Sequence, residues 1–122
     1  MKTRLALASL LALLALPVAG DAHAVLVKSS PARRAVLAVP PPRVELVFNE
    51  RLEPAYSTVS VWAAGDVRVD DGTVIVGPDD RRRLSVGLPP LKRGTYSVKF
   101  RVLSVDGHIV EGTYTFEVRP RP

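Results

Sequence analysis

The stretch TYSVKFRV, Thr95–Val102, decides the fold because its side chains alternate strictly between apolar and polar. Alternation with a period of two is typical of a β-strand that buries one face and exposes the other. The sequence predicts a buried face formed by Tyr96, Val98, Phe100 and Val102, opposite Ser97, Lys99 and Arg101. After a predicted turn at Asp106-Gly107, residues 112–118 repeat the pattern and place three more side chains inward: Tyr114, Phe116 and Val118.

The rest of the chain consists of similar short runs separated by Pro, Gly and Asp. We expect further strands at 24–28, 43–48, 58–63, 67–69, 73–76 and 84–88. Residues 33–39 are expected to connect two strands, and Asp70-Asp71-Gly72 is a favourable hairpin signal between 67–69 and 73–76. Because no helical period is sustained, the pattern predicts an all-β protein, an antiparallel Greek-key β-sandwich or barrel of about seven strands.

The first residues have the composition of a secretion signal. Lys2 and Arg4 precede an apolar run, Leu5–Val18, that is shorter than the roughly 20 residues a spanning helix needs. Small residues follow at Ala19, Gly20, Ala22 and Ala24, so cleavage after Gly20, Ala22 or Ala24 stays open. We expect a signal peptide at 1–22 and a single β-sandwich domain at 23–122, exported to the periplasm and not anchored in the membrane.

Composition limits the chemistry that is available to an exported chain of this kind. The absence of cysteine excludes disulfides and thiolate metal sites, blue copper included. Met1 is the only methionine, so no thioether site for copper(I) remains after cleavage. The net charge is +5, but an exported protein rarely meets nucleic acid. The basic run Arg81-Arg82-Arg83 is interpreted as a solvated loop, or alternatively as a docking patch for anionic lipid or an acidic partner.

The two histidines, His23 and His108, are the residues most suggestive of a site. Asp106 and His108 alternate in an extended segment, so their side chains can converge on one ion, although Asp-Gly is also an ordinary hairpin pair. Cleavage after Ala22 would make His23 the N-terminus, whose amine and imidazole can chelate a metal together. An amine, two imidazoles and a carboxylate suit copper(II), and zinc would accept similar ligands. Cleavage after Ala24 would remove His23.

Several motifs in order resemble the CopC family of periplasmic copper-resistance proteins. They are His23-Ala24, Ser29-Ser30-Pro31-Ala32, residues 44–50 (VELVFNE), 91–98 (LKRGTYSV) and 101–108 (RVLSVDGH), and then Gly112, Phe116 and Val118. The resemblance implies a cupredoxin-like or immunoglobulin-like sandwich, cleavage before His23, and one copper(II) ion bound by His23, Asp106 and His108. Glu50 would lie close by as an outer-sphere or weak ligand.

The resemblance also implies a role and a partner. The role would be copper sequestration and resistance, or delivery to an inner-membrane copper transporter of the CopD-like kind, by a monomer without enzymatic activity. Some members carry a methionine-rich copper(I) site, from which this chain departs because it lacks the methionines.

Two other interpretations stay open. An N-terminal histidine that binds copper through both its amine and its imidazole is called a histidine brace. Copper monooxygenases that attack polysaccharides use the same arrangement, so an enzyme of that kind is the first alternative. An immunoglobulin- or fibronectin-like binding or scaffold module would need no metal, and in such domains a tyrosine at the position of Tyr96 bonds back to the preceding loop. No Ser-His-Asp arrangement or phosphate-binding glycine loop is present.

Overall fold

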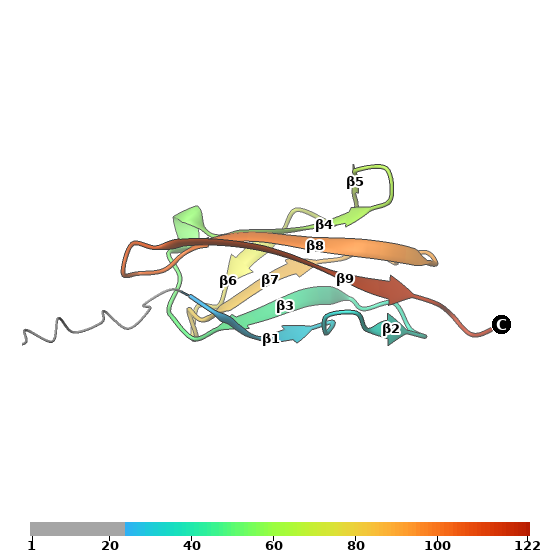
Figure 1. The fold of residues 1–122 in the computed structure, drawn as a ribbon, viewed down its shortest axis with the longest axis horizontal. Coiled ribbons are helices and arrows are strands. Elements are labelled where there is room, and N and C mark those ends of the chain that lie inside the picture. The colour runs from blue at the N-terminus through green and yellow to red at the C-terminus, as the bar shows by residue number, and fades with distance from the viewer. Residues whose placement is uncertain (1–23) are drawn as a thin grey trace, which may run out of the picture.

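A computed structural model of the chain describes residues 24–122. Two β-sheets pack face to face, as Figure 1 shows. One has the strand order β1-β3-β7-β6 and the other β2-β9-β8-β4-β5. The strands are β1 (Leu26–Ser30), β2 (Val36–Leu37), β3 (Arg43–Phe48), β4 (Thr58–Ala63), β5 (Val67–Arg68), β6 (Val74–Val76), β7 (Arg83–Gly87), β8 (Gly94–Leu103) and β9 (Ile109–Val118), with a 3-10 turn, η1 (Pro54–Tyr56), before β4. The predicted all-β sandwich is confirmed.

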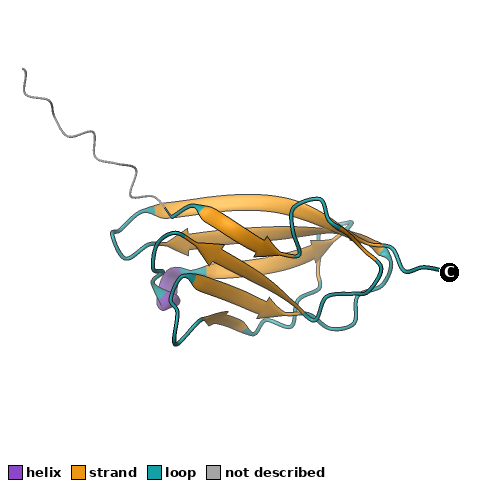
Figure 2. Cartoon of the chain, turned by 90° about the horizontal axis from the view of Figure 1, so that it is seen from below, coloured by secondary structure: helices purple, strands orange, loops and turns teal. Residues whose placement is uncertain are grey.

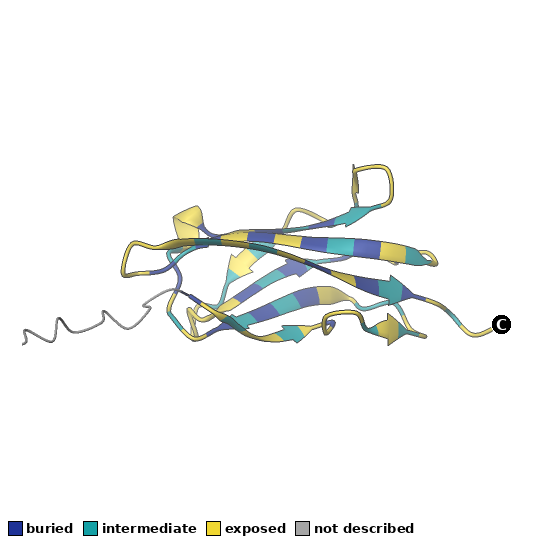
Figure 3. Ribbon diagram, in the orientation of Figure 1, coloured by how far each residue is buried: buried dark blue, intermediate teal, exposed yellow. Residues whose placement is uncertain are grey.

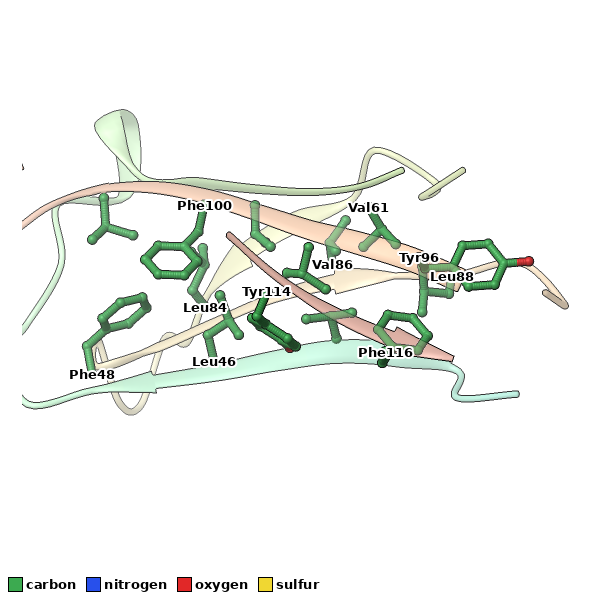
Figure 4. Close-up of a cluster of buried hydrophobic side chains, with 14 of the residues drawn as sticks. Leu46, Phe48, Val61, Leu84, Val86, Leu88, Tyr96, Phe100, Tyr114 and Phe116 are labelled. Atoms are coloured by element: carbon green, nitrogen blue, oxygen red, sulfur yellow. The ribbon is translucent and has the colours of Figure 1, made fainter. Parts of the chain in front are cut away.

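The core lies between the two sheets and is formed by the apolar face of each strand. Figure 4 shows the side chains of both sheets pointing toward one another. All seven residues predicted to point inward from β8 and β9 are buried, as are Val44, Leu46, Phe48, Val59 and Val61. The alternation of buried and exposed residues along β8 is visible in Figure 3. The two-residue period of the sequence therefore predicted the core correctly.

The β8–β9 hairpin is the longest paired element, with ten matched residue pairs from Gly94↔Val118 to Leu103↔Ile109. The hydroxyl of Tyr96 donates to the carbonyl oxygen of Lys92 at 2.5 Å and so fixes the turn that enters β8. Tyr96 has the structural role that its position in the sequence suggested.

Some local predictions were wrong. Asp70-Asp71-Gly72 does not join a hairpin, because β5 pairs with β4 in one sheet and β6 pairs with β7 in the other. The Asp70 carboxylate instead accepts hydrogen bonds from the amides of Val61 and Gly72 and from Arg68, so the segment crosses between sheets. The connection at 33–39 contains the short strand β2, which pairs with β9 in parallel rather than antiparallel fashion. These differences depend on partners far away in sequence.

Two further structural points concern the N-terminal prediction and membranes. The predicted signal peptide, residues 1–22, and His23 lie outside the described residues. Within the described part of the chain, no helix has the length and apolar character that crossing a membrane requires.

Gly112 generates a test of the core. A Cβ atom at Gly112 would overlap the ring of Phe100, its partner across the hairpin, and that ring packs edge-on against Phe48 with centroids 5.5 Å apart. We expect Gly112→Ala to lower the free energy of unfolding by about 1–3 kcal/mol, because the Phe100 ring must leave its place. Urea denaturation measures the change. Thr113→Ala, at the adjacent exposed position, should change stability by less than about 0.5 kcal/mol. Equal stability of Gly112→Ala and the parent would contradict the packing described.

Tyr114 generates a second test. Its hydroxyl is buried and makes no hydrogen bond among the described residues. Burial raises the pKa of Tyr114 from 10.0 to about 12, and the Ser29 hydroxyl, which lies nearby but does not meet hydrogen-bond geometry, lowers it only partly. We expect Tyr114→Phe to raise stability by up to about 1 kcal/mol, since an unsatisfied hydroxyl is removed.

The raised pKa also has a consequence at alkaline pH. A folded-state pKa above the unfolded value gives stability that is present below pH 10.0 and lost as the pH rises to about 12, so Tyr114→Phe should flatten that loss. Thermal unfolding at several pH values measures it. Tyr96→Phe is the matched control and should be destabilising, because its hydroxyl is hydrogen-bonded. Destabilisation by Tyr114→Phe would show that its hydroxyl has a partner.

Candidate metal centre

One end of the sandwich gathers several segments that are far apart in sequence. Figures 1 and 2 both place the start of β1, the 3-10 turn η1 and the β8–β9 turn at this end, opposite the C-terminus. Residues 49–52, which follow β3, run between the start of β1 and the β8–β9 turn and bond to both. The two regions in which the sequence placed candidate ligands therefore lie at the same end.

Asp106 and His108 come together on the β8–β9 turn. The Nδ1 atom of His108 lies 3.2 Å from Oδ2 of Asp106, and the two side chains are 48% and 28% exposed. Gly107 between them has a φ of 92°, a left-handed conformation that glycine adopts without strain. The tight turn brings a carboxylate and an imidazole into contact while leaving both partly open to solvent.

Ser104 holds this pair in place, a role that was not predicted from the sequence. Its hydroxyl donates to Oδ1 of Asp106, and its backbone amide donates to the carbonyl oxygen of His108 at 3.0 Å. Ser104 is fully buried, so the residue that holds the turn is itself fixed in the interior of the domain. The signal that could have revealed it is the Ser-x-Asp spacing before the glycine, since serine hydroxyls commonly bond to groups two residues away.

The electrostatics of the turn favour an ionised carboxylate. The hydroxyl of Ser104 is the largest influence on Asp106, and it lowers the pKa of that carboxyl below its ordinary value. Desolvation acts in the opposite direction, and hydrogen bonds from the side chain and backbone of His108 lower the pKa further. Asp106 is therefore present as an anion near neutral pH, the form in which a carboxylate binds a metal ion.

The start of the described chain is fixed beside β3 by Asn49. The Oδ1 atom of Asn49 accepts a hydrogen bond from the Val25 amide at 2.6 Å, and its backbone amide donates to the Val25 carbonyl oxygen at 3.0 Å. Ala24 is only 1% exposed and belongs to the core. The residue that directly follows His23 is thus held firmly at this end of the sandwich.

The next residues connect that anchor to the turn. The carbonyl oxygen of Arg51 accepts a hydrogen bond from the Val105 amide at 3.0 Å, and Leu52 forms an isolated bridge with Ser104. Glu50 lies between Asn49 and Arg51 and is half-buried. Asn49 therefore contacts the start of β1, and Arg51, two residues later, contacts the candidate turn.

The described residues do not form a metal site by themselves. Within residues 24–122, no three histidine, cysteine, aspartate or glutamate side chains group together in a way that could hold a metal ion. Asp106 and His108 supply two donors, and Glu50 does not complete a group of three with them. The predicted ligand set also includes His23, which lies outside the described residues, so the complete set stays a prediction.

Comparison with known proteins gives a consistent family. The model of the CopC domain family matches residues 26–119. The chain is 34% identical to copper transport protein CutJ of Bacillus subtilis over 110 residues, which cover 89% of this chain and 20% of CutJ. It is 35% identical to protein YobA of Escherichia coli, with 80% of each chain covered. It is 30% identical to copper resistance protein C of Pseudomonas syringae, with 81% of this chain and 82% of that one covered.

Solved structures give the same result. CopC from Methylosinus trichosporium OB3b has a TM-score of 0.73 and 42% identity, over 82% of this chain and 97% of that one. PcoC, a methionine-rich copper resistance protein from Escherichia coli, has a TM-score of 0.71 and 30% identity, over 80% of this chain and 100% of that one. With its two packed sheets and its match to the family model over most of its length, this chain belongs to the CopC family.

Proposed function

We propose that this chain is an exported protein that binds one copper(II) ion, for copper sequestration and resistance or for delivery to a copper transporter in the inner membrane. The observation that carries the proposal is the contact between Asp106 and His108 on a turn that hydrogen bonds of residues 49–52 connect to Val25, two residues after His23. The relatives named for copper transport and copper resistance support copper as the ion.

Copper(II) is the cargo of the protein in this proposal. The ligands proposed are the α-amine and imidazole of His23, the carboxylate of Asp106 and the imidazole of His108, with Glu50 close by as an outer or weak ligand. Nitrogen and oxygen donors of this kind suit copper(II) in a tetragonal arrangement. The ordinary pKa of an α-amine is about 7.7–8.0, so a metal can displace its proton near neutral pH.

The donor set also bears on the oxidation state. PcoC is described as methionine-rich, whereas the only methionine of this chain is Met1, which the proposed signal peptide contains. Soft thioether donors are the ones that copper(I) prefers. We therefore propose a protein that holds copper(II) alone and has no second site for reduced copper.

The proposal includes the organisation of the chain and its location. Residues 1–22 are a signal peptide, and residues 23–122 form a single domain that is released into the periplasm as a monomer. The role is binding rather than catalysis, because a carboxylate beside the imidazole stabilises copper(II) and opposes the reduction that oxygen chemistry requires. The alternative is a scaffold module that binds no metal. In that case substitutions at the turn, such as His108→Ala, would leave the function of the protein unchanged.

The turn residues generate a direct test. We expect His108→Ala to weaken copper(II) binding by at least about 100-fold, because even residues that only orient a metal ligand contribute about 10- to 100-fold. Ser104→Ala should weaken binding by about tenfold, because it loosens Asp106 without removing a donor. Competitive titration against a chelator of known affinity measures both.

The control for the turn variants is Asp66→Asn, an exposed carboxylate in the turn between β4 and β5 at the opposite end of the sandwich. It should retain the parent affinity, and circular dichroism should show that all variants stay folded. Unchanged affinity in His108→Ala would exclude His108 as a ligand. The same titration with zinc measures how strongly the site prefers copper.

The N-terminus generates a second test. Native mass spectrometry of protein matured in its own secretion pathway should show a chain that begins at His23 and retains one copper(II). An N-terminally acetylated chain of the same length should bind far more weakly, because acetylation removes the amine donor. A mature chain that begins at Val25 would exclude His23 from the site. A chain that begins at Asp21 would place His23 third, and Asp21-Ala22-His23 could then bind copper(II) through its deprotonated backbone amides without His108.

A further inference from the structure

The outer face of the five-stranded sheet carries a shallow groove that the proposed copper site does not use. Its volume is about 460 Å³, and its polar lining comes from three neighbouring strands: Thr58 and Ser60 of β4, Lys99 and Arg101 of β8, and Glu111 and Thr113 of β9. Strand alternation accounts for this composition, because these residues occupy the exposed positions of strands whose other face is the core, as Figure 3 shows along β8.

The groove continues toward the candidate metal centre. A second hollow of about 110 Å³ is lined by Tyr56, Arg101, Leu103 and Ile109, so the two share Arg101. Tyr56 is 71% exposed and Ile109 is 55% exposed, so the hollow between them offers apolar surface to a ligand. Ile109 directly follows His108 in sequence, so the apolar end of the groove adjoins the turn.

The charges in the groove are arranged to accept an anion. Lys99 lies over the ring of Trp62, with its ammonium nitrogen 5.1 Å from the ring centroid, and makes no ion pair among the described residues. Arg101 contacts Glu111 at 3.1 Å, but both side chains are more than half exposed, and surface pairs of this kind contribute little net free energy because solvent screens them. An incoming carboxylate could therefore engage Arg101 and Lys99 at little cost.

The geometry points to this groove as a docking site for an extended acidic segment of a partner protein, whose carboxylates contact Lys99 and Arg101 and whose apolar side chain enters the Tyr56–Ile109 hollow. This inference deepens the proposed function and rests on it for one point: a segment held there would bring its protein beside the turn that carries Asp106 and His108. The hydroxyls of Thr58, Ser60 and Thr113 would bond to the backbone of the segment.

Two features favour a protein over a glycan or a lipid surface. The apolar hollow suits an aliphatic or aromatic side chain, which a uronic acid chain lacks. The exposed side chains of Tyr56 and Arg101 are of the types that dominate binding energy in protein interfaces. Recognition of anionic lipid commonly uses clusters of about 4–8 basic residues, whereas this groove holds two cations and one acid.

The test uses the metal-free protein and three probes. The first is a short capped peptide of aspartate, glutamate and serine with one leucine at its end, and the second is the same peptide with lysine in place of the acids. The third is oligogalacturonate, an acidic sugar. Nuclear magnetic resonance titration should show amide shifts from the acidic peptide at residues 58–60, 99–101 and 109–113, and none from the basic peptide.

Variants separate specific docking from general attraction. Lys99→Gln combined with Arg101→Gln should weaken binding of the acidic peptide by about tenfold, because ion pairs between solvent-exposed groups are weak and two of them are lost. Lys28→Gln combined with Arg33→Gln removes the same charge from exposed positions outside this sheet face and should have little effect. Replacing the terminal leucine of the peptide with glycine should abolish the shifts at Tyr56 and Ile109.

The inference would be overturned if the acidic peptide did not bind, if both double variants weakened its binding equally, or if the amide shifts were spread over all basic surfaces. It would also be overturned if oligogalacturonate or phosphatidylglycerol vesicles bound more tightly through the same residues. The Lys99/Arg101 variant should still bind one copper(II) ion, because neither residue belongs to the proposed ligand set. If the parent protein did not bind copper(II), the proposed function would be refuted while the peptide result would stand. Failure of the proposed function and failure of this inference are therefore distinguishable.

Discussion

The candidate site depends on the backbone of residues 49–52, which joins the two sheets at one end of the sandwich. Asn49 exchanges two hydrogen bonds with Val25, which directly precedes β1 of the first sheet, and two residues later Arg51 accepts one from Val105, which follows β8 of the second sheet. Hydrogen bonds have narrow ranges of length and angle, so these contacts fix the start of β1 relative to the β8–β9 turn. Any ligand set that combines the N-terminus with that turn relies on them.

The site lies on a turn because the interior has no room for polar ligands. Every inward position of β3, β4, β8 and β9 carries an apolar or aromatic side chain, apart from Gly94 at the start of β8 and Gly112, whose missing side chain makes room for Phe100. Close-packed cores of this kind leave the chemistry to loops that a rigid scaffold positions. Ser104 links the two regions, since it is fully buried yet bonds to Asp106 at the surface.

The two ends of the sandwich differ in ways that matter for function. At the end with the C-terminus, Pro40–Pro42 and Pro89–Pro90 line an apolar hollow together with Leu88. The opposite end holds the polar turn and the exposed side chains of Tyr56 and Ile109. The groove on the outer face of the β8–β9 hairpin continues toward that second end through Arg101, so a partner bound along it would lie beside the turn.

The sequence by itself determined most of the strands, the two faces of β3, β4, β8 and β9, and the presence of Asp106 and His108 on a glycine turn, because these features depend on neighbours within a few residues. The limits predicted for 43–48 and 58–63 match β3 and β4. The resemblance in the motifs from Val44 to His108 also predicted the family that the comparisons show.

Only the tertiary structure decided which strands pair, that 70–72 crosses between sheets, and that β2 runs parallel to β9. The roles of Asn49 and Ser104 likewise depended on it. Asn49 acts on a residue 24 positions away, and Ser104 is informative only because it is buried. The physical reason is range: periodicity records which face of a strand meets water, whereas pairing and polar anchoring depend on contacts between residues that only folding brings together.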